Sequence, residues 1–177
     1  PPTQVGDVVL ASKLERLISL GGVLFGDGRV RAPYRRGQLV LFSPPPPLSE
    51  RLAAAGGRLG ARDLFVKRVV AVGGDSVRLL PGGIVSVNGE PRDRPPRACP
   101  LAGNDDEASL AESARRSAMM TLSTEGRLVP DGSLFVLGDC AERSVDSRVW
   151  GPLESNYVVG EPVLRLWPPD RMGLINQ

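Results

Sequence analysis

The sequence predicts a single domain that is mainly β. Short apolar runs recur at close intervals, glycine and proline separate them, and several runs alternate with a period of two, which is typical of antiparallel strands joined by tight turns. The 177 residues suit one domain, and a hydrophobic content of 41% is sufficient for a core. We therefore expect residues 1–177 to form one domain with an antiparallel β core and short helices.

Seven apolar runs are the expected strands. They are Asp7–Ala11, Gln38–Phe42, Leu64–Val72, Ser76–Leu80, Gly83–Val87, Ser133–Leu137 and Val158–Leu166. Pro81-Gly82-Gly83 and Asn88-Gly89 supply turns between them, because glycine and asparagine tolerate a positive φ.

Two stretches are expected to be helical, Ser49–Ala55 and Asp105–Met120, with Ser49 and Asn104 as their capping residues. The four prolines Pro44–Pro47 predict an extended or polyproline II connection before the first helix. A ligand for a proline-recognising domain is the alternative reading of this run.

An insertion is expected at residues 90–127. Between Glu90 and Arg127 the composition changes to arginine, proline, alanine and serine, with few β-branched residues and no period of two. We expect this segment to be partly mobile and to lie within the one domain.

The composition excludes several kinds of site. There is no histidine, and the 22 basic residues include only two lysines, Lys13 and Lys67. A Ser-His-Asp triad, a histidine-built zinc site and a four-thiolate site are therefore excluded, and we expect no metal and no cofactor. A net charge of +2 with scattered arginines gives no reason to expect a nucleic acid partner.

Lysine remains as a candidate base, because a buried lysine can lose its proton whereas arginine stays charged. Chance, under an arginine-favouring base composition, is the alternative explanation for so few lysines. A period of two places Lys67 on one face of the strand Leu64–Val72 with Phe65, Val69 and Ala71; the other face carries Leu64, Val66, Val70 and Val72.

Desolvation disfavours the charged form of a lysine among apolar neighbours, so we expect the pKa of Lys67 to fall. An amine tuned in this way can accept a proton from a serine hydroxyl at neutral pH. The alternative is that the stem of Lys67 packs against the strand while its ammonium group reaches water.

A second candidate segment, Gly138 to Arg148, follows the strand Ser133–Leu137 and is rich in small and polar residues. Such loops often support active sites. Ser144 could orient a lysine amine, and Asp146 with Arg148 could form an ion pair that fixes the loop. The alternative is a capped turn that carries surface charges.

In order along the chain, these segments resemble the type I signal peptidase family. The five matching boxes are Gly6–Leu10 followed by Lys13; Gly37–Phe42; Phe65–Val70 with Gly74-Asp75; Val87–Gly89 and Val129-Pro130 with Phe135–Asp139; and Ser144–Arg148. Five boxes in order are a specific signal, where one alone would be weak. Trp150–Leu153 and Trp167–Arg171 are most similar to cyanobacterial and plastid members, the thylakoidal processing peptidases.

The resemblance implies a signal-peptidase-like antiparallel β core and a membrane-anchored serine endopeptidase that removes signal peptides after small residues, in an Ala-x-Ala pattern. Lys67 would be the general base and Ser144 would orient its amine. Gly138, Asp139, Asp146 and Arg148 would support the site. The peptide would lie along Leu64, Phe65 and Val66.

The resemblance also implies a location. The catalytic domain would lie on the trans side of the membrane, in a thylakoid lumen or periplasm, with its membrane contact through an upstream anchor. Precursor proteins that carry signal peptides would be its partners.

The nucleophilic serine of the family pattern Ser-Met-x-Pro-Thr should precede Gly6-Asp7. Only the tail of the pattern matches here, at Pro1 or at Pro2-Thr3, which places the serine two or three residues before Pro1. The sequence as it stands is therefore expected to be inactive. The loop also departs from the family, because Cys140 and Ala141 stand where asparagine and arginine are usual.

Cys99 and Cys140 are a candidate disulfide in an oxidising lumen, and two unpaired thiols are the alternative. Two rival functions remain open. One is a self-cleaving repressor-type protease with the same serine and lysine chemistry, and the other is a catalytically inactive β module that binds extended peptides.

Overall fold

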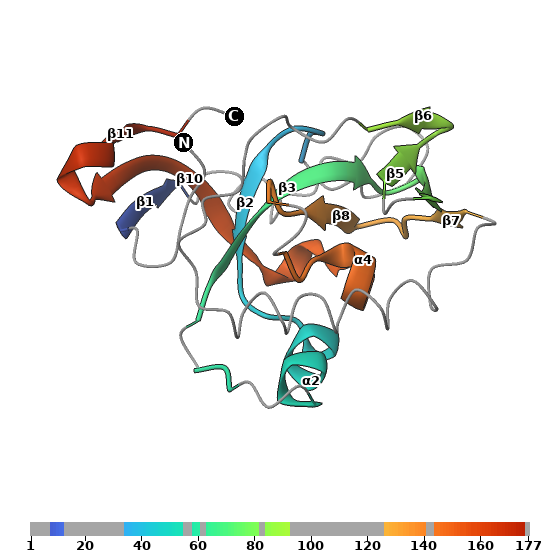
Figure 1. Ribbon diagram of the computed structural model, residues 1–177, viewed down its shortest axis with the longest axis horizontal. Coiled ribbons are helices and arrows are strands. Elements are labelled where there is room, and N and C mark those ends of the chain that lie inside the picture. Colours follow the sequence, from blue (N-terminus) through green and yellow to red (C-terminus); the bar gives the residue numbers. More distant parts are fainter. Residues whose placement is uncertain are drawn as a thin grey trace.

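The computed structural model describes residues 8–12, 34–54, 58–60, 63–81, 84–92, 126–140 and 144–175. They form two antiparallel sheets with a few short helices (Figure 1), so the prediction of a mainly β, antiparallel fold is confirmed. The expected helix Asp105–Met120, its cap Asn104 and nearly all of the insertion lie outside the described residues. None of the helices in the described ranges has the length and apolar character needed to span a bilayer.

Among the described residues, the larger sheet has seven strands. In spatial order they are β1 (Val8–Ser12), β10 (Val158–Trp167), β2 (Leu39–Phe42), β3 (Phe65–Val72), β8 (Ser133–Leu137) and β9 (Leu153–Glu154), with β11 (Gly173–Leu174) also paired to β10. The smaller sheet has the order β6 (Glu90–Pro91), β5 (Ile84–Val87), β4 (Ser76–Leu80) and β7 (Arg127–Leu128). Wherever the ends of the seven predicted strands are described, they agree with the observed ends to within one residue.

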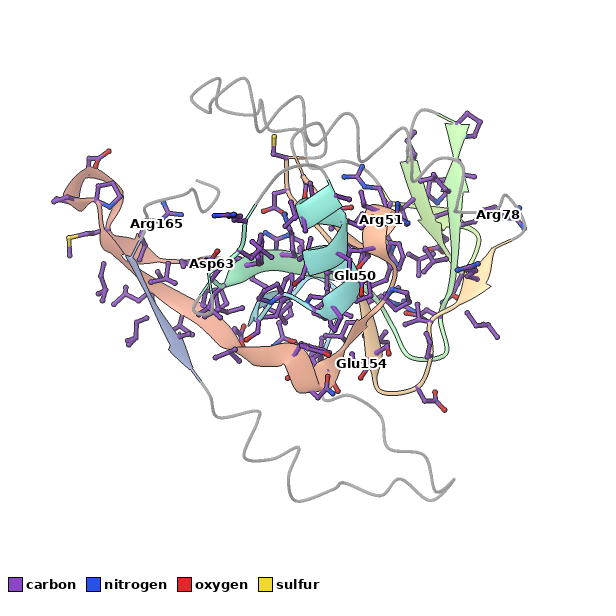
Figure 2. All side chains as sticks on the ribbon, turned by 90° about the horizontal axis from the view of Figure 1, so that it is seen from below. Glu50, Arg51, Asp63, Arg78, Glu154 and Arg165 are labelled. Atoms are coloured by element: carbon purple, nitrogen blue, oxygen red, sulfur yellow. The ribbon has the colours of Figure 1, made fainter. Side chains whose placement is uncertain are left out.

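A hydrophobic core lies between the larger sheet and two helices, α2 (Pro46–Ala54) and α4 (Ser147–Trp150). Its buried members are Tyr34, Val40, Phe42, Leu48, Val69, Leu134, Val136, Val149, Trp150, Leu153 and Val158. Figure 2 shows α2 lying across the middle of this face of the sheet. Two 3₁₀ turns, Ser155–Tyr157 and Pro169–Arg171, flank β10.

A second core joins the two sheets. It contains Ala71, Val77, Val85, Val87, Val129 and Phe135. The turn between β5 and β6 is formed as predicted, because Asn88 and Gly89 have φ values of 54° and 88°. Gly82 and Gly83 of the other predicted turn lie outside the described residues.

A bulge in β3 overturns one sequence-based expectation. The register between β3 and β8 shifts between Val69 and Ala71, so Val70 is an extra residue in the ladder. Val69 therefore packs into the first core and Ala71 into the second, although a strict period of two put both on one face. The expectation that Phe65, Lys67, Val69 and Ala71 share one face is therefore wrong for Ala71.

The proline run is partly helical, which corrects the expected extended connection over Pro44–Pro47. Helix α2 begins at Pro46, because proline fits the first turn, where its missing N–H has no helical partner. The carbonyl of Pro45 accepts from the amides of Leu48 and Ser49. Ser49 is thus inside the helix, donating its hydroxyl to Pro45, and does not cap it as expected.

Candidate active site

Lys67 and Ser144 are in contact although they lie 77 positions apart in the sequence. Nζ of Lys67 donates to Oγ of Ser144 at 2.8 Å. Lys67 is half-buried in β3, where Val40 of the first core is its partner on β2, and Ser144 is only 4% exposed. The amine therefore has a specific hydroxyl partner inside the protein, and this contact argues against the alternative of a lysine that simply reaches water.

Gly138 borders this pair at very short range. A Cβ placed on Gly138 would lie 2.1 Å from Oγ of Ser144 and 3.3 Å from Nζ of Lys67. A contact of 2.1 Å is impossible for two heavy atoms that are not bonded, so any side chain here would displace Ser144. The absence of a Cβ at Gly138 is what allows the backbone to pass beside the two side chains.

A buried ion pair lies next to this contact. Arg148 donates from Nε to Oδ1 of Asp146 at 2.8 Å and from Nη2 to Oδ2 at 2.7 Å. Oδ2 also accepts from the amide of Gly138 at 3.1 Å, and Oδ1 caps α4 by accepting from the amide of Arg148. Asp146 is fully buried and Arg148 is 6% exposed, so these residues are not the surface charges of the alternative reading.

The short helix α4 holds the Gly138–Arg148 segment at its carboxyl-terminal end. Ser147, the first residue of α4, is fully buried, and its hydroxyl accepts a hydrogen bond from the amide of Val136 in β8 at 3.0 Å. Val149 and Trp150 belong to the first core. Ser144 is therefore held between the end of β8 and a helix that the core anchors.

Arg68 and Asp139 form a second, partly exposed ion pair beside the site. Arg68 donates from Nε and Nη2 to the two oxygens of Asp139, each at 2.8 Å, and from Nη1 to the carbonyl of Gly37. Hydrogen bonding to Asp139 raises the pKa of Arg68 above its ordinary value, by more than burial lowers it. Sequence reasoning named Asp139 and missed Arg68. The available signal was its position, directly after Lys67 and opposite the end of β8.

Within the described residues, the strand that carries Lys67 has a free edge next to the site. Phe65, Val66 and Lys67 pair with β2 on one side, whereas the pairing of β3 with β8 begins only at Arg68. Among the described residues, no strand occupies the second side of this stretch. Leu64, directly before it, is 47% exposed, and Phe65 stacks on Phe42 with ring centroids 5.9 Å apart.

Cys140 is disulfide-bonded. Cys99 lies outside the described residues, so the pairing of these two cysteines stays a prediction. In the part of the chain that is described, no three His, Cys, Asp or Glu side chains are grouped so as to hold a metal ion.

Comparison with known proteins assigns the family. The family model "Signal peptidase, peptidase S26" matches residues 1–167. The chain belongs to this signal peptidase family. The match includes both parts of the candidate site, Lys67 and the Gly138–Arg148 segment. It also includes the start of the chain, where the first of the matching motifs lies.

Curated members of the signal peptidase family show the same relationship. "Thylakoidal processing peptidase 1, chloroplastic" of Arabidopsis thaliana is 33% identical over 76% of this chain, and "Signal peptidase I" of Leptolyngbya laminosa is 29% identical over 80%. The matches span 33% and 57% of those two proteins, respectively. A solved signal peptidase I from Enterococcus faecalis V583 is 19% identical, covers 74% of this chain and 97% of its own, and has a TM-score of 0.42.

Proposed function

We propose that this chain is the catalytic domain of a serine endopeptidase that removes signal peptides, with Lys67 as its general base. The observation that carries the proposal is the hydrogen bond between Nζ of Lys67 and Oγ of Ser144, beside the free edge of β3. Membership of the signal peptidase family supports it.

In the proposed mechanism the nucleophile is a serine upstream of Pro1. The uncharged amine of Lys67 takes the proton of that hydroxyl while the serine oxygen attacks the carbonyl carbon of the scissile peptide bond. Lys67 then gives the proton to the leaving amine as the C–N bond breaks, which leaves an acyl-enzyme. A water molecule that gives a proton to Lys67 then attacks the acyl carbon. The ester C–O bond breaks, and Lys67 returns that proton to the serine oxygen, which restores the hydroxyl and releases the carboxyl product. Backbone amide groups would stabilise the oxyanion.

Ser144 fits the role of an orienting group better than that of the nucleophile. A nucleophile has to reach the substrate, but Ser144 is 4% exposed and lies against the backbone of Gly138. By accepting a hydrogen bond from Nζ, Ser144 leaves the lone pair of the amine to point toward another hydroxyl. Asp146 and Arg148 hold the segment that carries it.

The free edge of β3 gives the proposed substrate its place. An extended peptide can add as a strand beside Leu64, Phe65 and Val66 through main-chain hydrogen bonds, which positions its scissile bond near Lys67. Half-buried Phe65 and Val66 would leave only shallow pockets for side chains, consistent with cleavage after small residues in an Ala-x-Ala pattern.

The relatives support a proposal for the partners and the location of the enzyme. Its substrates would be precursor proteins, and an upstream anchor would tie it to a membrane with the catalytic domain on the trans side. The relatives named thylakoidal processing peptidase favour a thylakoid lumen, whereas those named signal peptidase I are equally compatible with a periplasm.

The test uses the chain extended upstream through the expected serine, with a purified precursor and product detection by mass spectrometry. We expect Lys67→Ala to lower kcat/KM by about 10³-fold or more, because the general base is lost, and Ser144→Ala to lower it by about 10- to 100-fold. Arg78→Ala is the matched control, since Arg78 is exposed on β4 of the smaller sheet, toward one end of the molecule in Figure 2.

Full activity of the Lys67→Ala variant would overturn the mechanism. If the extended chain binds the precursor but never cleaves it, with or without Lys67, the alternative of a catalytically inactive peptide-binding module is correct. A loss of activity for Ser144→Ala as large as that for Lys67→Ala, with serine-reactive inhibitors labelling Ser144, would make Ser144 the nucleophile.

A further inference from the structure

A depression of about 530 Å³ lies at the end of the larger sheet where β8 and β9 pair. Residues 130–133, which run from the turn before β8 into its first residue, form one wall, and residues 154–156 form the other, with Pro152 beside them. Ser133 pairs with Glu154 in the register of β8 and β9, so their side chains project from the same face of the sheet. We call this depression the β8–β9 pocket.

The β8–β9 pocket is separate from the candidate active site. The next pair along the two strands, Leu134 and Leu153, belongs to the first core, so the pocket lies on the opposite face of the sheet. Lys67 is on the core side, because its partner on β2 is Val40. The 5 residues of β8 also separate the pocket from the candidate site, by about 17 Å along the strand. A ligand in the pocket would therefore not touch the amine of Lys67.

Backbone hydrogen bonds fix the walls of the β8–β9 pocket. The amide of Ser155 donates to the carbonyl of Gly132 at 2.9 Å, and the amide of Ser133 donates to the carbonyl of Pro130 at 3.0 Å. Gly132 has a φ of 75°, which favours glycine, and the rings of Pro130 and Pro152 restrict the backbone further. The shape of the pocket is therefore formed before any ligand binds.

Hydrogen-bonding groups in the β8–β9 pocket lack partners. Ser133 is 6% exposed, and among the described residues its hydroxyl has no hydrogen-bond partner. Asp131 and Glu154 are exposed carboxylates; within the described ranges Asp131 accepts from no side chain, and Glu154 accepts only from the side-chain amide of Asn156, at 3.2 Å. A hydroxyl as buried as that of Ser133 normally has a partner in the protein or in a ligand. An unpartnered buried hydroxyl beside two carboxylates points to a ligand that donates hydrogen bonds.

The charge of the β8–β9 pocket is opposite in sign to that of the chain. The chain has 22 basic and 20 acidic residues, but no arginine or lysine is among the described residues that line the pocket. Figure 2 shows the labelled arginines Arg51, Arg78 and Arg165 away from Glu154, which lies near the lower margin of the ribbon. The two carboxylates of the pocket therefore favour a cation that comes from outside the described structure.

A guanidinium group fits these acceptors better than a metal ion does. Ca²⁺ takes about six to eight oxygen ligands, and within the described ranges no three His, Cys, Asp or Glu side chains are grouped so as to hold a metal. A planar guanidinium has five N–H donors, which can pair with carboxylate and hydroxyl oxygens together. The pocket volume of about 530 Å³ is in the range of sites for organic groups and far exceeds the roughly 30 Å³ of one water molecule.

We propose that the β8–β9 pocket binds the guanidinium group of an arginine side chain in a partner polypeptide. Asp131 and Glu154 would accept its charge-assisted hydrogen bonds, and the hydroxyl of Ser133 would accept one more at the base of the pocket. The pocket is open on one side, so the main chain of the partner would stay outside. This inference does not depend on the proposed function, because the pocket and Lys67 lie on opposite faces of the sheet.

The test is a titration of the ¹⁵N-labelled 177-residue chain with the peptide acetyl-Gly-Arg-Gly-amide, followed by amide chemical shifts. We expect saturable shifts at the amides of the pocket, with a Kd near about 1 mM. Asp131→Asn with Glu154→Gln should raise Kd about tenfold or more, because the charged acceptors are lost. Ser133→Ala changes no charge and should raise Kd about three- to tenfold.

The matched control is Glu50→Gln with Glu90→Gln. This variant removes the same charge from exposed positions on α2 and β6, so its Kd should equal that of the wild type. Melting curves followed by circular dichroism establish that all variants are folded. Lys67→Ala should also bind the peptide like the wild type, so failure of this proposal is distinct from failure of the proposed mechanism.

Several outcomes would overturn the proposal. Shifts that do not saturate, an unchanged Kd for Ser133→Ala, or an equal loss in the control variant would show only non-specific attraction to acidic residues. Equal binding of the same peptide with lysine in place of arginine would remove the guanidinium assignment, and tighter binding of CaCl₂ at the same amides would make the pocket a metal site. Free arginine that binds about tenfold more tightly than the peptide would make the ligand a small molecule.

Discussion

Two aspartate–arginine pairs hold different parts of this molecule in different ways. Asp146 and Arg148, beside Lys67 and Ser144, have side chains that are 0% and 7% exposed and lie two residues apart. Asp75 and Arg36, where the two sheets meet, have side chains that are 9% and 40% exposed and lie 39 residues apart. The first pair shapes one segment, and the second ties distant segments together.

The surroundings of the two carboxylates explain what each pair contributes. Asp146 has its four hydrogen bonds from two residues, Arg148 and Gly138, all within the segment that carries Ser144. Burial alone would raise the pKa of Asp75, but hydrogen bonds from Arg36, the Val72 amide and Asn88 outweigh burial and hold that pKa below its ordinary value. The buried pair fixes local geometry, but removing one of its members should lower the unfolding free energy strongly. Removing one member of the partly exposed pair should lower it less, because water can solvate the charge that is left.

The largest expected effect is that of Asp146→Ala. Its loss removes the carboxylate that accepts two side-chain hydrogen bonds from the buried guanidinium of Arg148 and removes the cap of α4. We therefore expect the unfolding free energy to fall by about 3 to 5 kcal/mol in urea titrations. The double variant with Arg148→Met should recover part of that loss, because the buried guanidinium is removed together with the carboxylate. A loss below about 1 kcal/mol for Asp146→Ala would show that the buried pair stabilises the fold no more than the partly exposed Asp75–Arg36 pair does.

Gly138→Ala should have the next largest effect. The added methyl group would collide with Ser144, so we expect a loss of about 1 to 3 kcal/mol in unfolding free energy and a loss of peptidase activity in the upstream-extended chain. Combining Gly138→Ala with Ser144→Gly makes room for the methyl group and should restore much of the stability but not the activity. Independent, additive effects of the two substitutions would contradict the close contact.

Asp75→Asn should have the smallest effect and a characteristic pH dependence. We expect about 1 to 2 kcal/mol of destabilisation at pH 7, where the carboxylate is ionised. Because the folded pKa lies below the ordinary 3.8, the contribution is fully present above that value and is lost as pH falls through the folded pKa. Urea titrations at about pH 7, 5, 4 and 3 should show the two proteins converging below about pH 4, and a constant difference would refute the account.

The sequence was sufficient to predict what depends on local pattern. The strands follow runs of apolar residues. The candidate site residues Lys67, Ser144, Asp146 and Arg148 were named by residue type, but their proposed roles came from the family resemblance. Two-residue strands such as β6 and β7 were not predicted, because they have no pattern of their own and exist only through pairing with β5 and β4. The same applies to α4, whose four residues depend on the Asp146 cap and the core.

What sequence reasoning missed depends on register and on long-range contact. The bulge at Val70 divides β3 between two cores, and a period of two cannot reveal an inserted residue. Arg68 meets Asp139 only because the end of β8 lies opposite it. The start of α2 inside a proline run was mispredicted because proline is compatible both with polyproline II and with the first turn of a helix.

The chain leaves the smaller sheet at β6 and returns to it at β7, and these two strands are its opposite edges. The gap between them is three interstrand spacings, or about 14 Å, which roughly five extended residues can bridge. A connection of that length would be enough to join the two edges of the smaller sheet, whereas Lys67 lies in the larger sheet. The predicted Cys99–Cys140 disulfide would nevertheless tie the longer connection of this chain to the end of β8, beside Lys67 and Ser144, so that oxidation would link a segment of the smaller sheet's periphery to the candidate site.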